Sequence, residues 1–343
     1  MRSVPLVRLF WVHPILQFFR EAGAPVDRYL EEARLPAEVD QELDLAFPSP
    51  PLYDVIDRLV GESGYLDLGL TLGTKVRMRN LGPFGQQVAS QPTLREAIEI
   101  ACELMPAVHS ARRLTLSESG DMARLACRVN THQLMPVPLW DDQFTLSMLI
   151  DLVRSVAGID WLPNKATVQS DPWGPWPMTF GFGEILIRGG AEATAIEFPR
   201  GLLERRLTTS PERPDFESQA QHDLVTLPTD LAGCVQVTLR ALLVQGRFDL
   251  ATLACAVGSS VRTLQRRLSE RDRSFRDLLA EARLGVAHRR LRDPSAQVID
   301  VAFEAGYSDP SHFTRAFRNW TGETPMHYRR SHSATLSQAG PTP

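Results

Sequence analysis

The sequence is poor in lysine, in cysteine and in long apolar runs, and each shortage excludes a class of protein. Lysine occurs only at Lys75 and Lys165 among 343 residues, which leaves little room for Schiff-base chemistry. The four cysteines stand far apart and form no Cys-x-x-Cys pair, so we expect buried thiols in a reducing compartment. No stretch reaches about 18 apolar residues, so no transmembrane helix is expected.

The common catalytic and targeting motifs are also missing. The chain has no Gly-x-Ser-x-Gly and no His-Glu-x-x-His, and the nearest approach to a phosphate loop, residues 69–75, has Thr74 between its glycine and its lysine. No pair of His, Cys or acidic residues has metal-ligand spacing. The apolar N-terminal run is interrupted by Pro14 and lacks a small-residue cleavage site. We therefore expect no enzyme activity, no cofactor, no metal and no signal peptide.

What the chain does have is an average globular composition and an uneven charge. Hydrophobic residues make up 43% and charged residues 23%, and a chain of this length suggests two domains at roughly 100–200 residues each. Residues 231–343 hold 16 arginines and 10 acids, a net charge of +6, whereas residues 1–230 carry −10. The basic part is a candidate for contact with a polyanion, although arginines can also be a solvated helix surface.

Residues 1–207 alternate helical and strand signals and predict an α+β domain. Apolar residues recur at helical spacing over 92–110 and 144–158. Two alternating runs at 112–119 and 122–130 flank Gly120-Asp121, which is a hairpin signal. Further short strands are expected at 165–170, 184–190 and 193–198. Residues 208–229 read as a linker, 230–332 as a helical domain, and 333–343 as a disordered tail.

Residues 249–270 have the pattern of a helix-turn-helix. Gly258 suits the left-handed position that ends a short first helix, and Ser259 or Ser260 can cap the next one. In that second helix Leu264 and Leu268 share the face expected to be buried. The opposite face, expected to be exposed and to form hydrogen bonds, carries Arg262, Gln265, Arg266 and Ser269.

Residues 299–320 repeat this pattern. Ala254-x-x-x-Gly258 returns 48 residues later as Ala302-x-x-x-Gly306, whereas the Leu-x-Arg-x-Leu of the second helix returns 49 residues later as Phe313-x-Arg315-x-Phe317. The second turn is therefore one residue longer. Asp309 is predicted to cap its second helix, with Pro310 at the first position, and both phenylalanines are predicted to be buried. The residues expected to face outward are Ser311, Thr314, Arg315 and Arg318.

A long helix is predicted between the two copies, over residues 275–293. Its apolar stripe consists of Phe275, Leu278, Leu279, Ala282 and Val286. Such a helix spans about 27 Å, close to the roughly 34 Å between successive major grooves of a duplex. It can hold two reading helices about one duplex turn apart. A single helical hairpin is often no more than core packing, but two matched copies in a basic segment argue against that interpretation.

Residues 231–330 closely resemble the DNA-binding domain of AraC/XylS-type bacterial transcription regulators. The most similar run is 298–330, with Gly306-Tyr307-Ser308, Phe313, Phe317, Thr321-Gly322, Pro325 and Tyr328-Arg329. Residues 81–101 and 180–207 resemble, more weakly, the sensor domain of the ornithine-utilisation-regulator-like subgroup of that family. The resemblance implies a ligand-sensing and dimerisation domain over 1–207, and a double helix-turn-helix over 230–332.

The resemblance also implies which residues contact DNA. Base contacts are assigned to Arg262, Gln265, Arg266, Ser311 and Arg315. Arginine can pair with guanine and glutamine with adenine through two hydrogen bonds each. Backbone contacts are assigned to Ser269, Thr314, Arg318, Arg267 and Arg271, and Arg289 and Arg290 to phosphates or to solvated charge. Because Pro310 lacks an N–H and Ser311 is short, the second helix is expected to make fewer base contacts.

The sensor domain offers no assignable ligand residue. Its aromatic residues can line an apolar pocket but are individually better explained as core: Trp140, Phe144, Trp161, Trp173, Trp176, Phe180 and Phe182. Four polar residues can orient a ligand but are more often surface or satisfied interior groups: His109, His132, Asp141 and Asp142.

Together these features predict a sequence-specific regulator, by default an activator, that binds double-stranded promoter DNA. The expected partners are a small-molecule effector, a second copy of the chain and RNA polymerase, and the expected location is the cytoplasm, at the nucleoid, with no membrane contact. Two alternatives stay open. The N-terminal domain can serve only for dimerisation, without a ligand, or the chain can be an enzyme with a DNA-binding tail.

Overall fold

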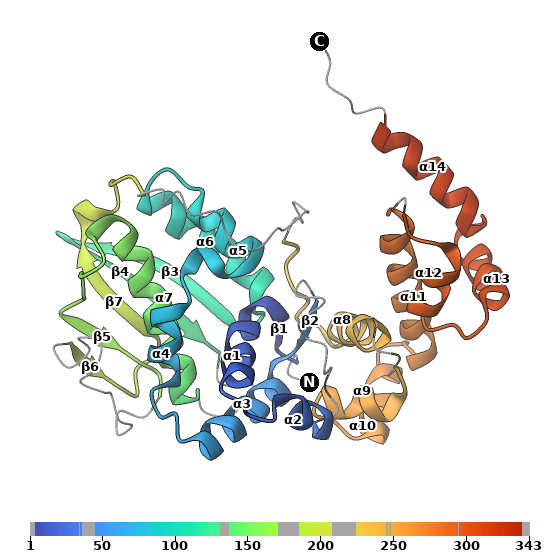
Figure 1. The fold of residues 1–343 in the computed structure, drawn as a ribbon, viewed down its shortest axis with the longest axis horizontal. Coiled ribbons are helices and arrows are strands. Elements are labelled where there is room, and N and C mark those ends of the chain that lie inside the picture. Colours follow the sequence, from blue (N-terminus) through green and yellow to red (C-terminus); the bar gives the residue numbers. More distant parts are fainter. Residues whose placement is uncertain are drawn as a thin grey trace, which may run out of the picture.

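The computed structural model describes residues 4–33, 35, 45–130, 137–170, 185–207, 224–244, 246, 248–293 and 295–337. Within them, an N-terminal unit of helices and a sheet is followed by a C-terminal unit built of helices (Figure 1). This order confirms the predicted fold class. The predicted linker, 208–229, lies mostly outside the described residues.

The N-terminal unit consists, in chain order, of β1 (Leu6–Arg8), α1 (Leu9–Glu21), α2 (Val26–Glu32), β2 (Ala46–Pro48), α3 (Ser49–Ser63), α4 (Leu68–Lys75), the 3₁₀ turn η1 (Met78–Asn80), α5 (Gly82–Ala89), α6 (Leu94–Val108), β3 (Arg112–Ser119), β4 (Met122–Val129), α7 (Leu139–Ala157), β5 (Lys165–Thr167), β6 (Leu186–Arg188), β7 (Thr194–Pro199) and the 3₁₀ turn η4 (Arg200–Leu202). The C-terminal unit consists of α8 (Leu231–Val244), α9 (Leu250–Ala256), α10 (Val261–Ser269), α11 (Phe275–Leu291), α12 (Val298–Glu304), α13 (Pro310–Thr321) and α14 (Pro325–Ser337).

A five-stranded sheet forms the centre of the N-terminal unit, with the order β3-β4-β7-β5-β6. The predicted hairpin is confirmed: β3 and β4 pair antiparallel from Arg112 opposite Val129 to Ser119 opposite Met122. The neighbouring pairs are antiparallel except β5 with β6. Along β4 the buried and less buried residues alternate, because α6 and α7 pack against the sheet and cover one face (Figure 1).

Helix α7 is the most deeply buried helix of this unit, as its sequence predicted. Trp140 and Phe144 are 4% and 0% exposed and belong to the hydrophobic core, where Phe144 meets Trp11 edge to face. Trp161 is partly buried against that core. These three aromatic residues are therefore core. The remaining aromatic candidates, Trp173, Trp176, Phe180 and Phe182, lie outside the described residues.

A buried ion pair links α7 to the sheet. The fully buried guanidinium of Arg112 bonds to the carboxylate of Asp141, to the hydroxyl of Tyr53 at 3.2 Å and to that of Thr145 at 2.7 Å. Burial, and then the nearby charge of Arg112, lower the pKa of His109 well below its usual range, so this imidazole stays neutral. Asp141 is therefore a satisfied interior group. A lone charge at this depth would be costly.

The neighbouring Asp142 is satisfied in the same way. Its carboxylate accepts hydrogen bonds from the backbone of Ser170 and from the hydroxyl of Thr194 in β7. Burial nevertheless raises the pKa of Asp142 above its ordinary value. Among the polar candidates for a ligand site, Asp141, Asp142 and His109 thus hold the interior together, and His132 lies outside the described residues.

Helix α8 joins the two units. It packs against β2 on one side and against α11 on the other. The thiol of Cys234 lies 3.2 Å from the carbonyl oxygen of Val4, and burial raises its pKa to about 11. The chain leading to α8 also lies against the N-terminal unit, because the backbone N–H of Leu227 donates to Pro106 and Arg8 donates to the carbonyl oxygen of Val225.

Helix α11 is the centre of the C-terminal unit and packs against α8, α12 and α14. Its predicted apolar stripe is confirmed: Leu278, Ala282 and Val286 are at most 3% exposed, and Phe275 and Leu279 are partly buried. The helix has 17 residues and so spans about 25 Å. Helix α14 runs to Ser337, which extends regular structure five residues into the predicted disordered tail. No helix in the described parts of the chain is long and apolar enough to cross a membrane.

The two turn glycines differ in their surroundings and allow a paired test of this packing. A Cβ on Gly306, at φ +76°, would lie 2.9 Å from Leu243 and 3.0 Å from Phe248, whereas a Cβ on Gly258, at φ +63°, has no atom within 4 Å. Gly258→Ala therefore costs roughly 1–2 kcal/mol of left-handed strain. Gly306→Ala adds about 1–3 kcal/mol of overpacking. Urea unfolding of the two variants measures the difference, and equal losses would contradict the packing of α8 on this turn.

Candidate nucleic-acid interface

The first helix-turn-helix is formed by α9 and α10. Asp249 caps α9 by accepting from the backbone N–H groups of Ala251 and Thr252, both at 2.9 Å. At the far end, Gly258 donates to Cys255 at 2.9 Å and Ser259 donates to Ala254 at 2.8 Å. This pair of hydrogen bonds, with a left-handed glycine, is the Schellman arrangement that stops a helix.

Ser260 resolves the choice between the two candidate capping residues. Its hydroxyl oxygen accepts from the backbone N–H of Thr263 at 3.2 Å, which satisfies a free donor of the first turn of α10. Leu264 and Leu268 are 0% and 1% exposed, as predicted. Helix α10 is therefore fixed at its N-terminus by its cap and along its inner face by two leucines.

The second helix-turn-helix, formed by α12 and α13, repeats the same turn. Gly306 donates to Phe303 at 2.8 Å and Tyr307 donates to Ala302 at 2.9 Å, which are the counterparts of the two bonds in the first unit. Asp309 caps α13 by accepting from the N–H of Ser311 at 2.6 Å, and these backbone hydrogen bonds lower the pKa of Asp309. The predicted cap is confirmed. It stands three residues after the glycine, against two in the first unit.

The inner face of α13 is aromatic. Phe313 and Phe317 are both 0% exposed, as predicted. Phe317 meets His288 and Tyr328 at ring-centroid distances of 5.6 Å, and the rings of His288 and Tyr328 stack at 4.7 Å. These rings lock α13 against α11 and α14, so the orientation of its outer face is determined by the core.

Two arginines of α11 hold the second unit in place. Arg283 donates to the carbonyl oxygen of Gly306 at 3.0 Å and lies over the rings of Tyr307 and Phe248 at 4.5 and 5.0 Å. Arg290 pairs with both carboxylate oxygens of Glu304 in α12. Arg290 is thus a partly exposed side chain that bridges α11 and α12, and its assignment to phosphate or to solvated charge stays a prediction.

The residues predicted to read bases are exposed on the outer faces of α10 and α13, opposite the buried side chains. On α10 these are Arg262, Gln265 and Arg266, and on α13 they are Ser311 and Arg315. Arg266 lies 3.7 Å from Glu270, and both side chains are exposed. Such a pair is worth about 0.5 kcal/mol, so it does not prevent Arg266 from turning toward another anion.

The residues predicted to contact the DNA backbone are more varied. Ser269 and Arg318 are exposed, and Thr314 is partly buried, with its hydroxyl donating to the carbonyl oxygen of Pro310 at 2.9 Å. Arg271 is exposed and donates to the carbonyl oxygen of the partly buried Arg267 at 3.0 Å. All five remain candidates, but Thr314 and Arg271 already have a hydrogen-bond partner within the protein.

One exposed residue of α13 was missed by the sequence analysis. His312 is exposed in the first turn, between Ser311 and the buried Phe313. The signal that identifies it is its spacing from Arg315 and Asn319, which are also exposed and follow it at intervals of three and four residues. The outer face of α13 is therefore wider than the predicted set, and its two edges carry His312 and Arg318.

The chemical groups on the two outer faces indicate what they can bind. Across the described stretches of the chain, no three His, Cys, Asp or Glu side chains gather closely enough to hold a metal ion. The chemical groups that the two outer faces offer are guanidinium, amide, hydroxyl and imidazole. These groups suit phosphates and base edges.

Comparison with known proteins identifies the two units. Residues 253–331 match the model of a helix-turn-helix domain, from α9 to α14. Residues 23–207, more than half of the chain, match the model of the arabinose-binding domain of AraC transcription regulators. The chain belongs to the AraC family of transcription regulators. Its C-terminal unit is the DNA-binding domain. Its N-terminal unit belongs to the class of ligand-binding domains found in this family.

Two relatives that are named as regulators match this chain over most of their length. The chain is similar to the regulator VirS of Mycobacterium tuberculosis, with 26% identity over 90% of this chain and 92% of that protein. It is also similar to the ornithine utilization regulator of Pseudomonas aeruginosa, with 25% identity over 77% and 78%. Among solved structures, it is similar to the transcriptional regulator CdpR of Pseudomonas aeruginosa, with 20% identity, a TM-score of 0.34, and coverage of 91% of this chain and 98% of that one.

The two kinds of predicted DNA contact can be separated by salt. Arg318→Ala removes one cation next to the outer face, so we expect the slope of log affinity against log salt concentration to fall by about one, with sequence preference unchanged. Arg266→Ala is expected to cost roughly 1–3 kcal/mol on the preferred sequence and much less on a scrambled one. Binding isotherms at several salt concentrations measure both. Arg128→Ala, an exposed arginine of the sheet paired with Glu192, is the control that should change neither.

Proposed function

We propose that this protein is a ligand-responsive activator whose two helix-turn-helix units read two successive major grooves of promoter DNA. The observation that carries the proposal is the duplicated turn. The same two hydrogen bonds close both turns, and each turn presents a helix with arginine on its exposed face. Helix α11, about 25 Å long, separates the two units by a distance suited to one duplex turn.

The base readers in this proposal are Arg262, Gln265 and Arg266 on α10, and Ser311 and Arg315 on α13. The phosphate contacts are Ser269, Arg267, Arg271, Thr314 and Arg318. Pro310 occupies the first position of α13 and lacks an N–H, and Ser311 is short. The second helix therefore contributes more through phosphates and less through bases than the first.

The N-terminal unit supplies control in this proposal. A small metabolite binds it and changes the relative stability of two arrangements of the units. Support comes from α8, which packs against elements of both units. A conformational change in one unit can therefore alter the packing of the other through this helix. The proposed domain limits are 1–207 for sensing and dimerisation, 208–229 for the linker and 230–332 for DNA binding.

We further propose that the protein acts as a homodimer in the cytoplasm, at the nucleoid, and that it contacts RNA polymerase. A dimer doubles the number of bound half-sites, which is how regulators commonly gain affinity. One relative, matched over 29% of this chain, is a transcriptional activator of Rhodococcus. Light scattering with and without DNA tests the assembly, and a monomer under both conditions would contradict it.

The decisive experiment is selection of bound duplexes from a random-sequence pool. Wild type, Arg266→Ala, Arg315→Ala and the control Arg128→Ala are compared at two salt concentrations. We expect a two-part motif spaced by about one helical turn. Arg266→Ala should blur one part, Arg315→Ala the other, and Arg128→Ala neither.

Two outcomes would contradict the proposal. If no motif emerges and binding only falls with salt, the outer faces contact phosphates without reading sequence. If both arginine variants blur the same part, the two units do not read successive grooves. A third outcome is that a motif emerges but that extracts of small metabolites do not change the affinity of the protein for it. That outcome would favour the alternative in which the N-terminal unit serves only for dimerisation.

A further inference from the structure

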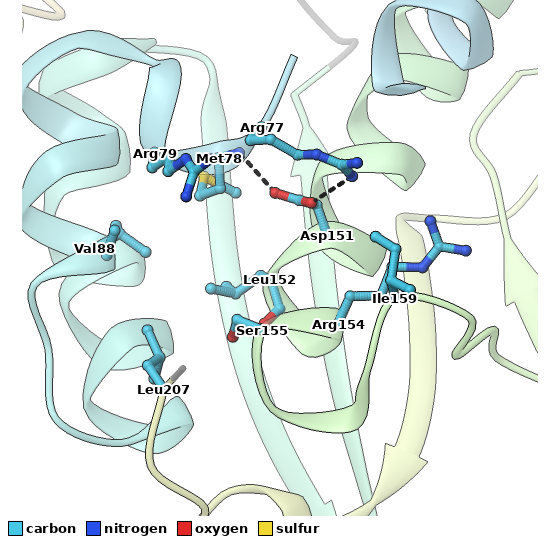
Figure 2. A pocket seen from close by; sticks show the side chains of 11 residues that line it. Arg77, Met78, Arg79, Val88, Asp151, Leu152, Arg154, Ser155, Ile159 and Leu207 are labelled. Atoms are coloured by element: carbon cyan, nitrogen blue, oxygen red, sulfur yellow. Dashed lines mark hydrogen bonds and ion pairs between the residues drawn. The ribbon is translucent and has the colours of Figure 1, made fainter. Parts of the chain in front are cut away.

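The N-terminal unit contains a cavity of about 320 Å³ that is not lined by the buried Arg112 network. One wall comes from η1 and α5, and the facing wall from the C-terminal half of α7 (Figure 2). Leu207 closes one side. This residue is the last one of the matched N-terminal domain, and it is held there by a hydrogen bond from its N–H to Pro92.

The polar lining of the cavity is mainly cationic. Arg77, Arg79 and Arg154 line it, and Asp151 is the one carboxylate among the lining residues that the structure describes. The carboxylate of Asp151 is already engaged, because it accepts from Arg77 at 3.0 Å and from the backbone N–H of Met78 at 2.8 Å (Figure 2). The formal charges of the lining therefore sum to a positive value.

Arg154 is less closely compensated than Arg77, which forms an ion pair with Asp151. The Nε of Arg154 donates to the carbonyl oxygen of Trp161 at 2.9 Å, and no carboxylate of the described residues is paired with it. Burial, and then the charge of Arg77, lower the pKa of Arg154, and the charges of Asp151 and Asp160 oppose this only in part. An anion that enters the cavity would relieve this repulsion.

The remainder of the lining is apolar. Val88 of α5 faces Leu152 of α7 across the cavity, with Leu207 beside them (Figure 2). Met78 and Ile159 complete the apolar lining. Ligand pockets combine a mostly apolar lining with a few polar groups that orient the ligand. Here the polar groups are cations, so the matching ligand has an apolar body and an anionic head.

We propose that this cavity is the effector site of the regulator and that its ligand is a small organic acid, with a carboxylate beside Arg154 and Arg77 and an apolar body against Val88, Leu152 and Leu207. The volume holds about ten water molecules, so the ligand is small. This inference rests on the proposed sensing function. An occupant touches Leu207, which couples the site to the part of the chain that leads to the DNA-binding domain.

The test compares four probes on the full-length protein by calorimetry: hexanoate, its neutral amide hexanamide, the cation hexylamine, and inorganic phosphate. Hexanoate is expected to bind at least about tenfold more tightly than the other three, because it alone combines an apolar chain with a negative charge that can accept hydrogen bonds from the arginines. Arg154→Gln should weaken hexanoate about tenfold and leave hexanamide unchanged. The matched control Arg128→Gln, an exposed arginine outside the cavity, should change neither affinity.

A second variant blocks the cavity without changing its charge. Ala89 lines it at the end of α5, and Ala89→Phe places a ring in the space. We expect this variant to lose hexanoate binding while its Tm without ligand and its DNA affinity stay close to those of wild type. The variant thus separates loss of the cavity from loss of the fold.

The outcomes separate the two proposals. Equal or tighter binding of hexylamine or hexanamide, binding of phosphate as tight as that of hexanoate, no binding of any probe, or an unaffected Arg154→Gln would each overturn the organic-acid site while leaving DNA reading intact. If hexanoate binds as expected but the affinity for the selected DNA motif does not change, the site is an organic-acid site that is not coupled to DNA binding. That outcome would contradict the proposed sensing function and not the organic-acid site.

Discussion

The burial of α8 from two sides is the constraint on which the arrangement of the whole molecule depends. Cys234 of this helix lies against the N-terminal unit, while Arg240 lies near Gly285 of α11 and Leu243 lies near Gly306. Exposing either side would cost about 25 cal/mol for each Å² of apolar surface. The helix therefore packs into the cores of both units. Its position depends on the sensor domain and on the DNA-binding domain at the same time.

This shared helix contacts both helix-turn-helix units, through α9 in the first and through the turn at Gly306 in the second. Leu243 and Phe248 surround Gly306, the turn of the second unit, and Arg283 ties the same turn to α11. The turn at Gly258 has no comparable neighbour. The position of α8 therefore bears on the packing of both helix-turn-helix units, and Leu207 of the cavity precedes α8 in the chain.

How much could be predicted from the sequence depended on how local the interactions are. The caps, the turn glycines and the buried Phe313 and Phe317 were predicted because their signals lie within a few residues of one another. The ion pair of Arg290 with Glu304 was not predicted, because the two residues lie on different helices and both look like surface charge. The cavity could not be predicted, since Arg77 and Arg154 come from segments far apart whose periodicity indicates only helix. His312 was predictable by spacing and was overlooked.

The extra residue in the second turn makes the two reading helices inequivalent. Ser260 caps α10 two residues after its glycine, and Asp309 caps α13 three residues after its own. With one more residue in the connection, and with proline instead of valine at the start of the helix, α13 cannot present its side chains as α10 does. In the proposed mode of binding, the two half-sites read by one protomer therefore differ from each other. A site made of two different half-sites has a direction, so under this proposal the DNA sequence would fix which way the protein faces along the promoter.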